Sequence, residues 1–190
     1  MTDKEVLNAY ERTGGVLKGH FLLTSGRHSD TYMQSAKLFV HPEESEKIVT
    51  ALAEKLKCYN AEMVVSPAVG GIILGYELAR QLKVTNIFAE RENGAMTFRR
   101  GFALEKGTRV VVAEDVVTTG GSVKEVIALC QSLGAEVVAC ASVVDRSNGK
   151  VEFGVPYVPL LSMEVTSWEP DECPLCKAGA EAPYKPGSRK

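Results

Sequence analysis

The chain has 190 residues, of which 45% are hydrophobic and 24% are charged, and its formal net charge is −2 at pH 7. This length suits one domain, and the composition is that of a globular protein, which excludes a disordered or fibrous chain. A near-neutral chain lacks the broad positive field of nucleic-acid-binding proteins, so we expect no nucleic-acid partner.

Membrane and export signals are also missing from the sequence. No apolar run approaches the ~20 residues of a membrane span, and the first ten residues are polar, so we expect neither a membrane partner nor a signal peptide. The five cysteines are an odd set in a chain that can build its own core. We therefore expect a reduced, cytoplasmic protein.

The N-terminal part predicts a group of small elements, here termed the hood (residues 1–41). Thr2 and Glu5 have the spacing of a capping box, which predicts a helix at the N-terminus. A short apolar run at residues 21–23 predicts a strand, followed by a polar turn. The segment Tyr32–Phe39 predicts a second strand.

Residues 42–168 predict an α/β core. Val-rich runs alternate with amphipathic helices, which is typical of a mostly parallel sheet covered by helices on both faces. The pattern predicts strands over residues 61–65, 84–89, 109–113 and 137–144, with helices that begin at Pro42, after Gly71 and after Gly121. Binding sites in such folds lie at the carboxyl ends of the strands, so we expect the site there.

Residues 169–190 have the composition of a tail, with four of the eight prolines of the chain. Cys173 and Cys176 have the spacing of a metal knuckle, but a structural zinc site needs four ligands. Two such pairs that meet across a dimer axis would complete a site; two free thiols or a redox pair are the alternatives. The three histidines show no ligand spacing: His20, His28 and His41. The other cysteines are interpreted as small packing residues: Cys58, Cys130 and Cys140.

The strongest signal for chemistry is the segment VVVAEDVVTTGGS at residues 110–122. A buried strand delivers two adjacent carboxylates, Glu114 and Asp115, and a turn rich in hydroxyls and glycine then opens a helix. Backbone N–H groups and hydroxyls that converge at a helix N-terminus form a cradle for phosphate. Acids just before such a cradle are placed to accept hydrogen bonds from the hydroxyls of a phosphorylated sugar. The plain alternative is a solvated strand end followed by an ordinary helix start.

Residues 111–122 resemble the 5-phosphoribosyl-1-pyrophosphate (PRPP) signature of the type I phosphoribosyltransferases. The resemblance covers residues 17–168 and is closest to the orotate phosphoribosyltransferases. Residues 21–29 are similar to the N-terminal hood segment of that family, and Tyr32–Met33 fall where the family places two aromatic residues near the base. The pair Asp145–Arg146 is similar to the strand end whose arginine contacts orotate in the family.

The resemblance implies a type I phosphoribosyltransferase fold and a reaction. PRPP and orotate would give orotidine 5′-monophosphate and pyrophosphate, with Mg²⁺ as cofactor, in the synthesis of pyrimidine nucleotides. The family forms homodimers, so a homodimer is implied as well. The chemistry is consistent with this, because breaking the anomeric C–O bond leaves an oxocarbenium-like sugar and gathers negative charge on the leaving pyrophosphate.

The resemblance also implies roles for individual residues. Glu114 and Asp115 would bind the ribose hydroxyls and act in catalysis together with Arg91, and Thr118 and Arg146 would position orotate. PRPP would be bound by nine consecutive residues: Glu114, Asp115, Val116, Val117, Thr118, Thr119, Gly120, Gly121 and Ser122. No residue is assigned as a protein ligand of a metal. Apart from the resemblance, the position of Arg146 before Ser147-Asn148-Gly149 favours a solvent-facing turn residue.

Two lysines of the orotate family are absent. Thr24 stands where the family has one, and the turn at residues 67–71 reads Pro-Ala-Val-Gly-Gly where the family has Pro-x-x-Lys-Gly. A hydrogen bond to a charged group contributes about 1.5–3 kcal/mol, so each lost lysine removes a factor of about 10–150 unless an arginine replaces it.

The mobile catalytic loop of the family corresponds to residues 89–101, which contain neither lysine nor histidine. Arg91, Arg99 and Arg100 are the candidate replacements in this loop, and the proton donor to pyrophosphate has no assignment. The polar, glycine-containing composition of residues 89–101 fits a lid that excludes water. The alternative is a surface β-hairpin whose arginines serve solubility.

Two other functions are compatible with the same motif. The first is transfer to a purine or another base by the same fold. The second is a regulator that senses PRPP without catalysis, which the lysine-poor loop favours and the low positive charge disfavours.

Overall fold

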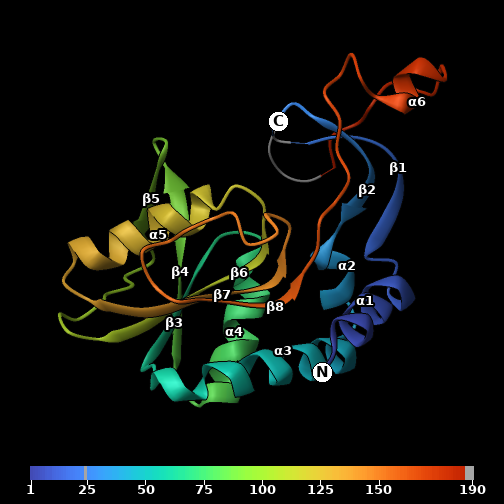
Figure 1. The fold of residues 1–190 in the computed structure, drawn as a ribbon. Helices are drawn as coiled ribbons and strands as arrows, with labels where there is room; N and C mark the ends of the chain where they lie inside the picture. The colour runs from blue at the N-terminus through green and yellow to red at the C-terminus, as the bar shows by residue number, and fades with distance from the viewer. Residues whose placement is uncertain (24, 187–190) are drawn as a thin grey trace.

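A six-stranded sheet forms the centre of the computed structural model, which describes residues 1–23 and 25–186 (Figure 1). The strand order is β5-β4-β3-β6-β7-β8, and all neighbours are parallel except the antiparallel pair β4 and β5. The strands are β3 (Met63–Pro67), β4 (Thr85–Glu92), β5 (Ala95–Phe98), β6 (Arg109–Val117), β7 (Glu136–Asp145) and β8 (Tyr157–Ser162). The predicted α/β class with a mostly parallel sheet is confirmed; the edge strand β8 was not predicted.

Helices cover both faces of this sheet, as the pattern predicted. α3 (Pro42–Leu56) and α4 (Gly71–Leu82) pack on one face and α5 (Gly121–Ser132) on the other, with the 3₁₀ turn η1 (Lys57–Tyr59) after α3 (Figure 1). Residues of β6 alternate between the two cores: Val111 joins the cluster of α3 and α4, whereas Val110 and Val112 join that of α5. This two-sided burial is why the strand reads as a continuous apolar run.

The cysteines of the core divide into two groups. Cys130 on α5 and Cys140 on β7 are fully buried, and burial raises the pKa of each thiol to about 12, which makes both unreactive packing residues as expected. Cys58 is exposed, so the packing interpretation is wrong for this residue.

The hood consists of α1 (Asp3–Arg12), an antiparallel pair β1 (Val16–Leu22) and β2 (His28–Met33), and α2 (Ser35–Phe39). The Thr2–Glu5 capping box is present at the start of α1. The predicted strand over residues 32–39 is wrong, because β2 begins four residues earlier and Ser35, Leu38 and Phe39 are buried at helical spacing. Short apolar runs leave the choice between helix and strand open in a sequence.

The C-terminal segment returns to the hood instead of hanging free. It contains one short helix, α6 (Pro174–Lys177), and lies side by side with β1 and β2 (Figure 1). Isolated bridges join His28 to Trp168 and Phe21 to Tyr184. Among the described residues, no helix has the length and hydropathy needed to cross a membrane.

Candidate active site

A cavity of about 770 Å³ opens at the carboxyl end of the sheet, between the core, the hood and the C-terminal segment. Its volume suits a small phosphorylated substrate. Its wall includes the nine consecutive residues predicted to bind PRPP: Glu114, Asp115, Val116, Val117, Thr118, Thr119, Gly120, Gly121 and Ser122. Arg146, Tyr32 and Met33 line it as well, so segments distant in the sequence meet here as the resemblance implied.

The two acids lie on a strand and not in the loop that the sequence suggested. β6 continues to Val117, because its parallel ladder with β7 extends past the predicted end and pairs Val117 with Asp145. Glu114 lies opposite Ser142 in this ladder. A hydrogen-bonded strand fixes the backbone of both acids, which gives their carboxylates a defined position at the cavity wall.

Asp115 sits in a network that partly compensates its burial. Its Oδ1 accepts the N–H of Val116 at 2.9 Å, and Oε1 of Glu114 accepts the N–H of Asp115 at 3.2 Å. Burial raises the pKa of the Asp115 carboxyl, while hydrogen bonds to Glu114, the Val116 amide and Ser35 act in the opposite direction. Ser35 is itself bonded to the Tyr10 hydroxyl at 2.8 Å, so the hood helices support this acid from behind.

The turn after β3 closes tightly on the acids. A Cβ atom on Gly70 would lie 3.0 Å from Oδ1 of Asp115, and one on Gly71 would lie 3.2 Å from the carbonyl oxygen of Ala113. A side chain at either position would force these neighbours to move by a few tenths of an ångström, so glycine favours this close approach. The peptide bond between Ala68 and Val69 in the same turn is cis.

The predicted phosphate cradle has the geometry of an open helix start. Gly120 adopts a φ of +73°, and a Cβ there would lie 2.8 Å from the ring of Phe153, so only glycine fits. Within residues 1–23 and 25–186, no side-chain cap hydrogen bond is found at Gly120, the N-cap of α5, and Thr118 and Thr119 are exposed at the cavity. An uncapped helix N-terminus next to two hydroxyls suits an anion.

Arg146 follows β7 on a loop that Asp145 holds in place. The Asp145 carboxylate is buried and accepts the N–H groups of Ser147 and Gly149 at 2.8 and 3.0 Å. The N–H of Arg146 donates to the carbonyl of Val117 at 2.8 Å. The two residues of the Asp-Arg pair therefore have different roles: Asp145 holds the loop in place, and Arg146 lines the cavity.

The Arg146 guanidinium is a desolvated cation. It lies 5.8 Å from the ring centroid of Tyr32, and its Nε is buried with no hydrogen-bond partner in the part of the chain that the structure describes. Burial lowers the pKa of this group. A buried, unpartnered donor is costly, and a bound carboxylate or carbonyl would satisfy it. The alternative of a solvent-facing turn residue does not fit this environment.

The arginines of residues 89–101 lie outside the cavity. β4 and β5 form a hairpin, and in this chain its arginines pair with acids on the surface: Arg91 with Glu125 at 2.8 Å, Arg99 with Glu92 at 3.3 Å and Arg100 with Glu90 at 2.8 Å. None of these arginines lines the cavity. The predicted lid therefore has the form of a surface hairpin within one chain, and the catalytic role of Arg91 stays a prediction.

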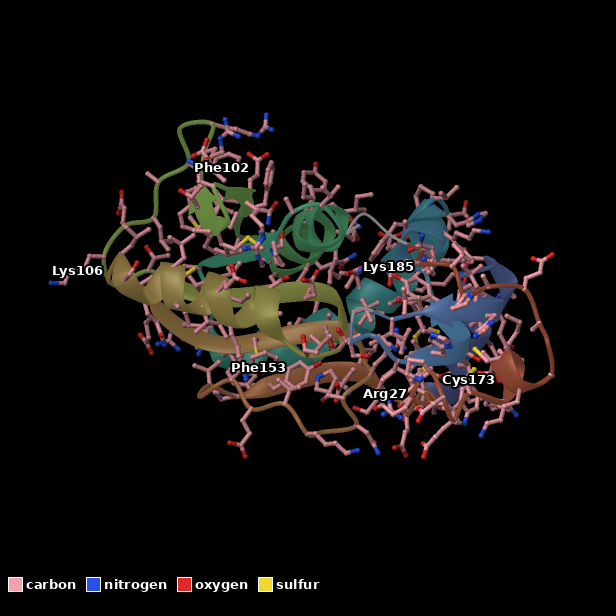
Figure 2. The ribbon with its side chains drawn as sticks, turned by 90° about the horizontal axis from the view of Figure 1, so that it is seen from above. Arg27, Phe102, Lys106, Phe153, Cys173 and Lys185 are labelled. Atoms are coloured by element: carbon pink, nitrogen blue, oxygen red, sulfur yellow. The ribbon has the colours of Figure 1, made fainter. Side chains whose placement is uncertain are left out.

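Lys185 was missed by the sequence analysis and lines the cavity from the C-terminal segment. Figure 2 shows it at the boundary between the core and the hood. No local pattern marked it, since it lies in a segment that reads as a tail. Thr24, the position of one absent family lysine, lies outside the described residues.

Comparison with known proteins agrees with this geometry. The phosphoribosyl transferase domain matches residues 37–169. An orotate phosphoribosyltransferase of Caldanaerobacter subterraneus subsp. tengcongensis is 54% identical over all 190 residues, which cover the whole of both chains. The chain belongs to the orotate phosphoribosyltransferase family.

Other orotate phosphoribosyltransferases are also similar to this chain in sequence or in structure. The Thermotoga maritima protein is 54% identical over 186 residues, which are 98% of this chain and 97% of that one. The crystal structure of orotate phosphoribosyltransferase from Aeropyrum pernix superposes with a TM-score of 0.74 at 27% identity and covers 83% of this chain and 93% of that one. Membership makes this chain a phosphoribosyltransferase, and the cavity is its candidate active site.

Proposed function

We infer that the chain transfers the 5-phosphoribosyl group from PRPP to orotate, which gives orotidine 5′-monophosphate and pyrophosphate for pyrimidine nucleotide synthesis. One observation supports this most strongly. A single cavity holds an acid pair, a helix start and an arginine whose buried Nε has no hydrogen-bond partner among the described residues, and each suits a different part of the two substrates.

We assign the sugar to the C-terminal end of β6 and its 5′-phosphate to the loop that follows. Glu114 and Asp115 accept hydrogen bonds from the ribose hydroxyls, and residues 118–122 hold the 5′-phosphate through backbone N–H groups and hydroxyls. Because the acids and the cradle are consecutive, the distance between them is fixed by the backbone, which favours one orientation of the sugar.

Orotate binds on the other side of the cavity in this proposal. Arg146 donates to its carboxylate or a ring carbonyl, Thr118 assists, and Tyr32 provides an aromatic face beside the guanidinium. The desolvated surroundings of Arg146 strengthen its attraction for an anion, because water competes less there.

The bond that breaks joins the anomeric carbon to pyrophosphate. The carboxylates beside the ribose stabilise the positive charge that develops on the sugar, and the hood and the C-terminal segment exclude water from the intermediate. Arg91 remains the proposed catalytic cation of the hairpin. Since Arg91 does not line the cavity of its own chain and pairs with Glu125 on the surface, it would act on the site of a partner in a homodimer.

Mg²⁺ is the proposed cofactor. Glu114 and Asp115 present the carboxylate oxygens that this ion prefers, and Gly70 leaves the oxygens of Asp115 unobstructed by a side chain. When bound, the ion neutralises negative charge on the pyrophosphate. The cytoplasmic location stays a prediction.

A panel of bases tests the proposal. The protein is mixed with PRPP and Mg²⁺ and given orotate, adenine, hypoxanthine or uracil separately, while pyrophosphate release is measured. We expect release with orotate only. Turnover with a purine and none with orotate would overturn the orotate assignment and leave the PRPP site intact.

The surface ion pairs of the hairpin arginines favour one second candidate, a PRPP-sensing regulator. Such a protein would bind PRPP, measured by calorimetry, without releasing pyrophosphate in the presence of any base. Steady turnover with orotate excludes it.

A further inference from the structure

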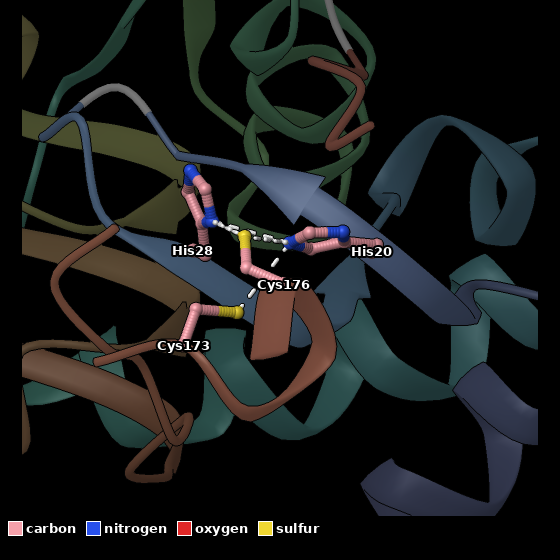
Figure 3. Close-up of side chains that lie close together, drawn as sticks. All are labelled: His20, His28, Cys173 and Cys176. Carbon is pink, nitrogen blue, oxygen red and sulfur yellow. Dashed lines mark hydrogen bonds between the residues drawn. The ribbon is translucent and has the colours of Figure 1, made fainter. Parts of the chain in front are cut away.

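Four potential metal ligands converge outside the active site. His20 lies on β1 and His28 is the first residue of β2. Cys173 immediately precedes α6, and Cys176 lies within it. One ligand atom from each residue lies within 4.8 Å of all the others. Figure 3 shows the two imidazole rings and two thiols pointing toward a common centre.

Four of the six distances between these atoms are close to the edges of a tetrahedron around zinc, and all six are within 4.8 Å. Nε2 of His20 is 3.1 Å from Nδ1 of His28, 3.4 Å from Sγ of Cys173 and 3.6 Å from Sγ of Cys176. Sγ of Cys176 is 3.3 Å from Nδ1 of His28. Bond lengths of ~2.3 Å to sulfur and ~2.0 Å to nitrogen give tetrahedral edges of roughly 3.3–3.8 Å.

A backbone contact sets the protonation of one ligand. Nδ1 of His20 is 2.7 Å from the carbonyl oxygen of Glu181, which accepts and cannot donate, so Nδ1 carries the proton. The Nε2 lone pair of the neutral ring then faces His28 and the two thiols. A carbonyl on the far nitrogen is the usual outer partner of a zinc-bound histidine.

We propose that His20, His28, Cys173 and Cys176 form a structural Zn²⁺ site within a single chain. Two sulfur and two nitrogen donors in tetrahedral arrangement suit Zn²⁺ among the common divalent ions. Four protein ligands leave no open position, which is the mark of a structural and not a catalytic site. The strands β1 and β2 supply the two ligands that a Cys-x-x-Cys pair lacks, so the site needs no partner subunit.

The ion would fasten the C-terminal segment to the hood. Backbone hydrogen bonds already join the two on both sides of the cluster: His28 N–H to the Trp168 carbonyl at 2.8 Å and Leu22 N–H to the Tyr184 carbonyl at 2.9 Å. The residue after Tyr184 is Lys185, which lines the active-site cavity. The zinc site therefore holds one wall of that cavity in place, although it contacts no predicted substrate residue.

Metal content tests the site without reference to activity. The full chain, purified without a histidine tag, is analysed by mass spectrometry of the elements, and we expect about one equivalent of zinc. Cys173→Ser combined with Cys176→Ser, and separately His20→Ala, should lower zinc at least tenfold. Cys58→Ser, which removes an exposed thiol elsewhere, is the matched control and should keep its zinc.

Two further measurements keep the test decisive if a ligand variant fails to fold. Co²⁺ added to wild-type protein stripped by a chelator should give the visible bands of a tetrahedral ion and a thiolate charge-transfer band. Proteolysis within residues 169–186 should become about tenfold faster after stripping and recover with Zn²⁺. Wild-type protein with no zinc, with iron in its place, or with a Cys173–Cys176 disulfide and no metal would overturn the proposal.

Discussion

The carboxyl edge of the sheet and the proposed zinc site differ in how the chain supplies their residues. At the sheet edge, nine consecutive residues from Glu114 to Ser122 supply the acid pair and three hydroxyls, and a strand and a helix hold them. In the cluster, two ligands come from the hood and two from near the C-terminus, and no single element holds all four.

The difference explains what each region can do. The consecutive motif fixes the distance from the acid pair to the helix start through the backbone itself, which suits a reaction that depends on orientation. The cluster lies where backbone hydrogen bonds already join the hood to the C-terminal segment, which suits a metal that adds folding energy to an existing contact. Substitutions in the two regions should therefore separate groups that act on substrate from groups that hold the cavity together.

The largest effect is expected for Asp115→Asn. The amide keeps the shape but loses the charge beside the sugar, so kcat should fall by about 100- to 1000-fold in the pyrophosphate-release assay. The exposed Asp3→Asn is the control and should retain full activity. Near-normal turnover of the Asp115 variant would mean that the sugar lies elsewhere.

The same variant carries a stability signature. Because burial raises the pKa of Asp115 in the folded state, its ionised form costs stability above the unfolded pKa. Asp115→Asn should therefore melt at or above the wild-type temperature at pH 7, and the difference should vanish as the pH falls below ~3.9. A lower melting temperature at pH 7 would contradict this.

Arg146→Ala sharpens the division of the cavity into a sugar side and a base side. Loss of a charged hydrogen bond should raise the KM for orotate about 10- to 150-fold and that for PRPP less than about threefold. Arg146→Lys should recover only part of the loss, since a lysine lacks the planar pair of donors. Equal effects on both substrates would refute a role on the base side.

Arg91→Ala tests whether the hairpin acts on a partner subunit. We expect kcat to fall about tenfold with little change in stability, because exposed ion pairs contribute under about 1 kcal/mol. Glu125→Gln is the matched control: it breaks the same ion pair, keeps the guanidinium and should leave kcat unchanged.

A mixing experiment separates action within a chain from action across a dimer. The Arg91→Ala and Asp115→Asn chains are coexpressed, so that about half of the dimers contain one chain of each kind. If Arg91 acts across the dimer, each mixed dimer has one intact site and one defective site. About a quarter of the wild-type activity should then be restored. Activity no higher than the average of the two separate variants would show that Arg91 does not reach across a dimer.

The smallest effect is expected for Lys185→Ala. This lysine lines the cavity from a segment that the zinc site fastens, so its loss should raise the KM for PRPP or orotate about three- to tenfold. Lys177→Ala, on the exposed side of α6, is the control and should change neither constant. Identical behaviour of the two variants would remove Lys185 from the site.

The sequence was most informative where chemistry and local structure coincide. The order Val-rich strand, acid pair, hydroxyl-glycine turn and helix predicted the cavity wall at residues 114–122. It was less informative where two local structures compete, as at Ser35–Phe39, which forms a helix instead of a strand. The end of β6 was also misplaced, since the ladder with β7 decides how far the strand continues.

Long-range contacts were beyond the reach of sequence patterns. His20 and His28 show no ligand spacing along the chain because their proximity comes from pairing of β1 with β2. The cysteine pair indicated two ligands of a metal site, and the other two, His20 and His28, lie on β1 and β2. Lys185 likewise gained its place only through the return of the C-terminal segment.

By itself, the sequence determined the α/β core and the loop that we propose binds phosphate, because hydrophobic period, glycine and helix-start chemistry act over a few neighbouring residues. Only the tertiary structure decided which distant side chains share a cavity or a metal site. Such meetings depend on how the hood and the C-terminal segment pack, and packing is a property of the whole chain.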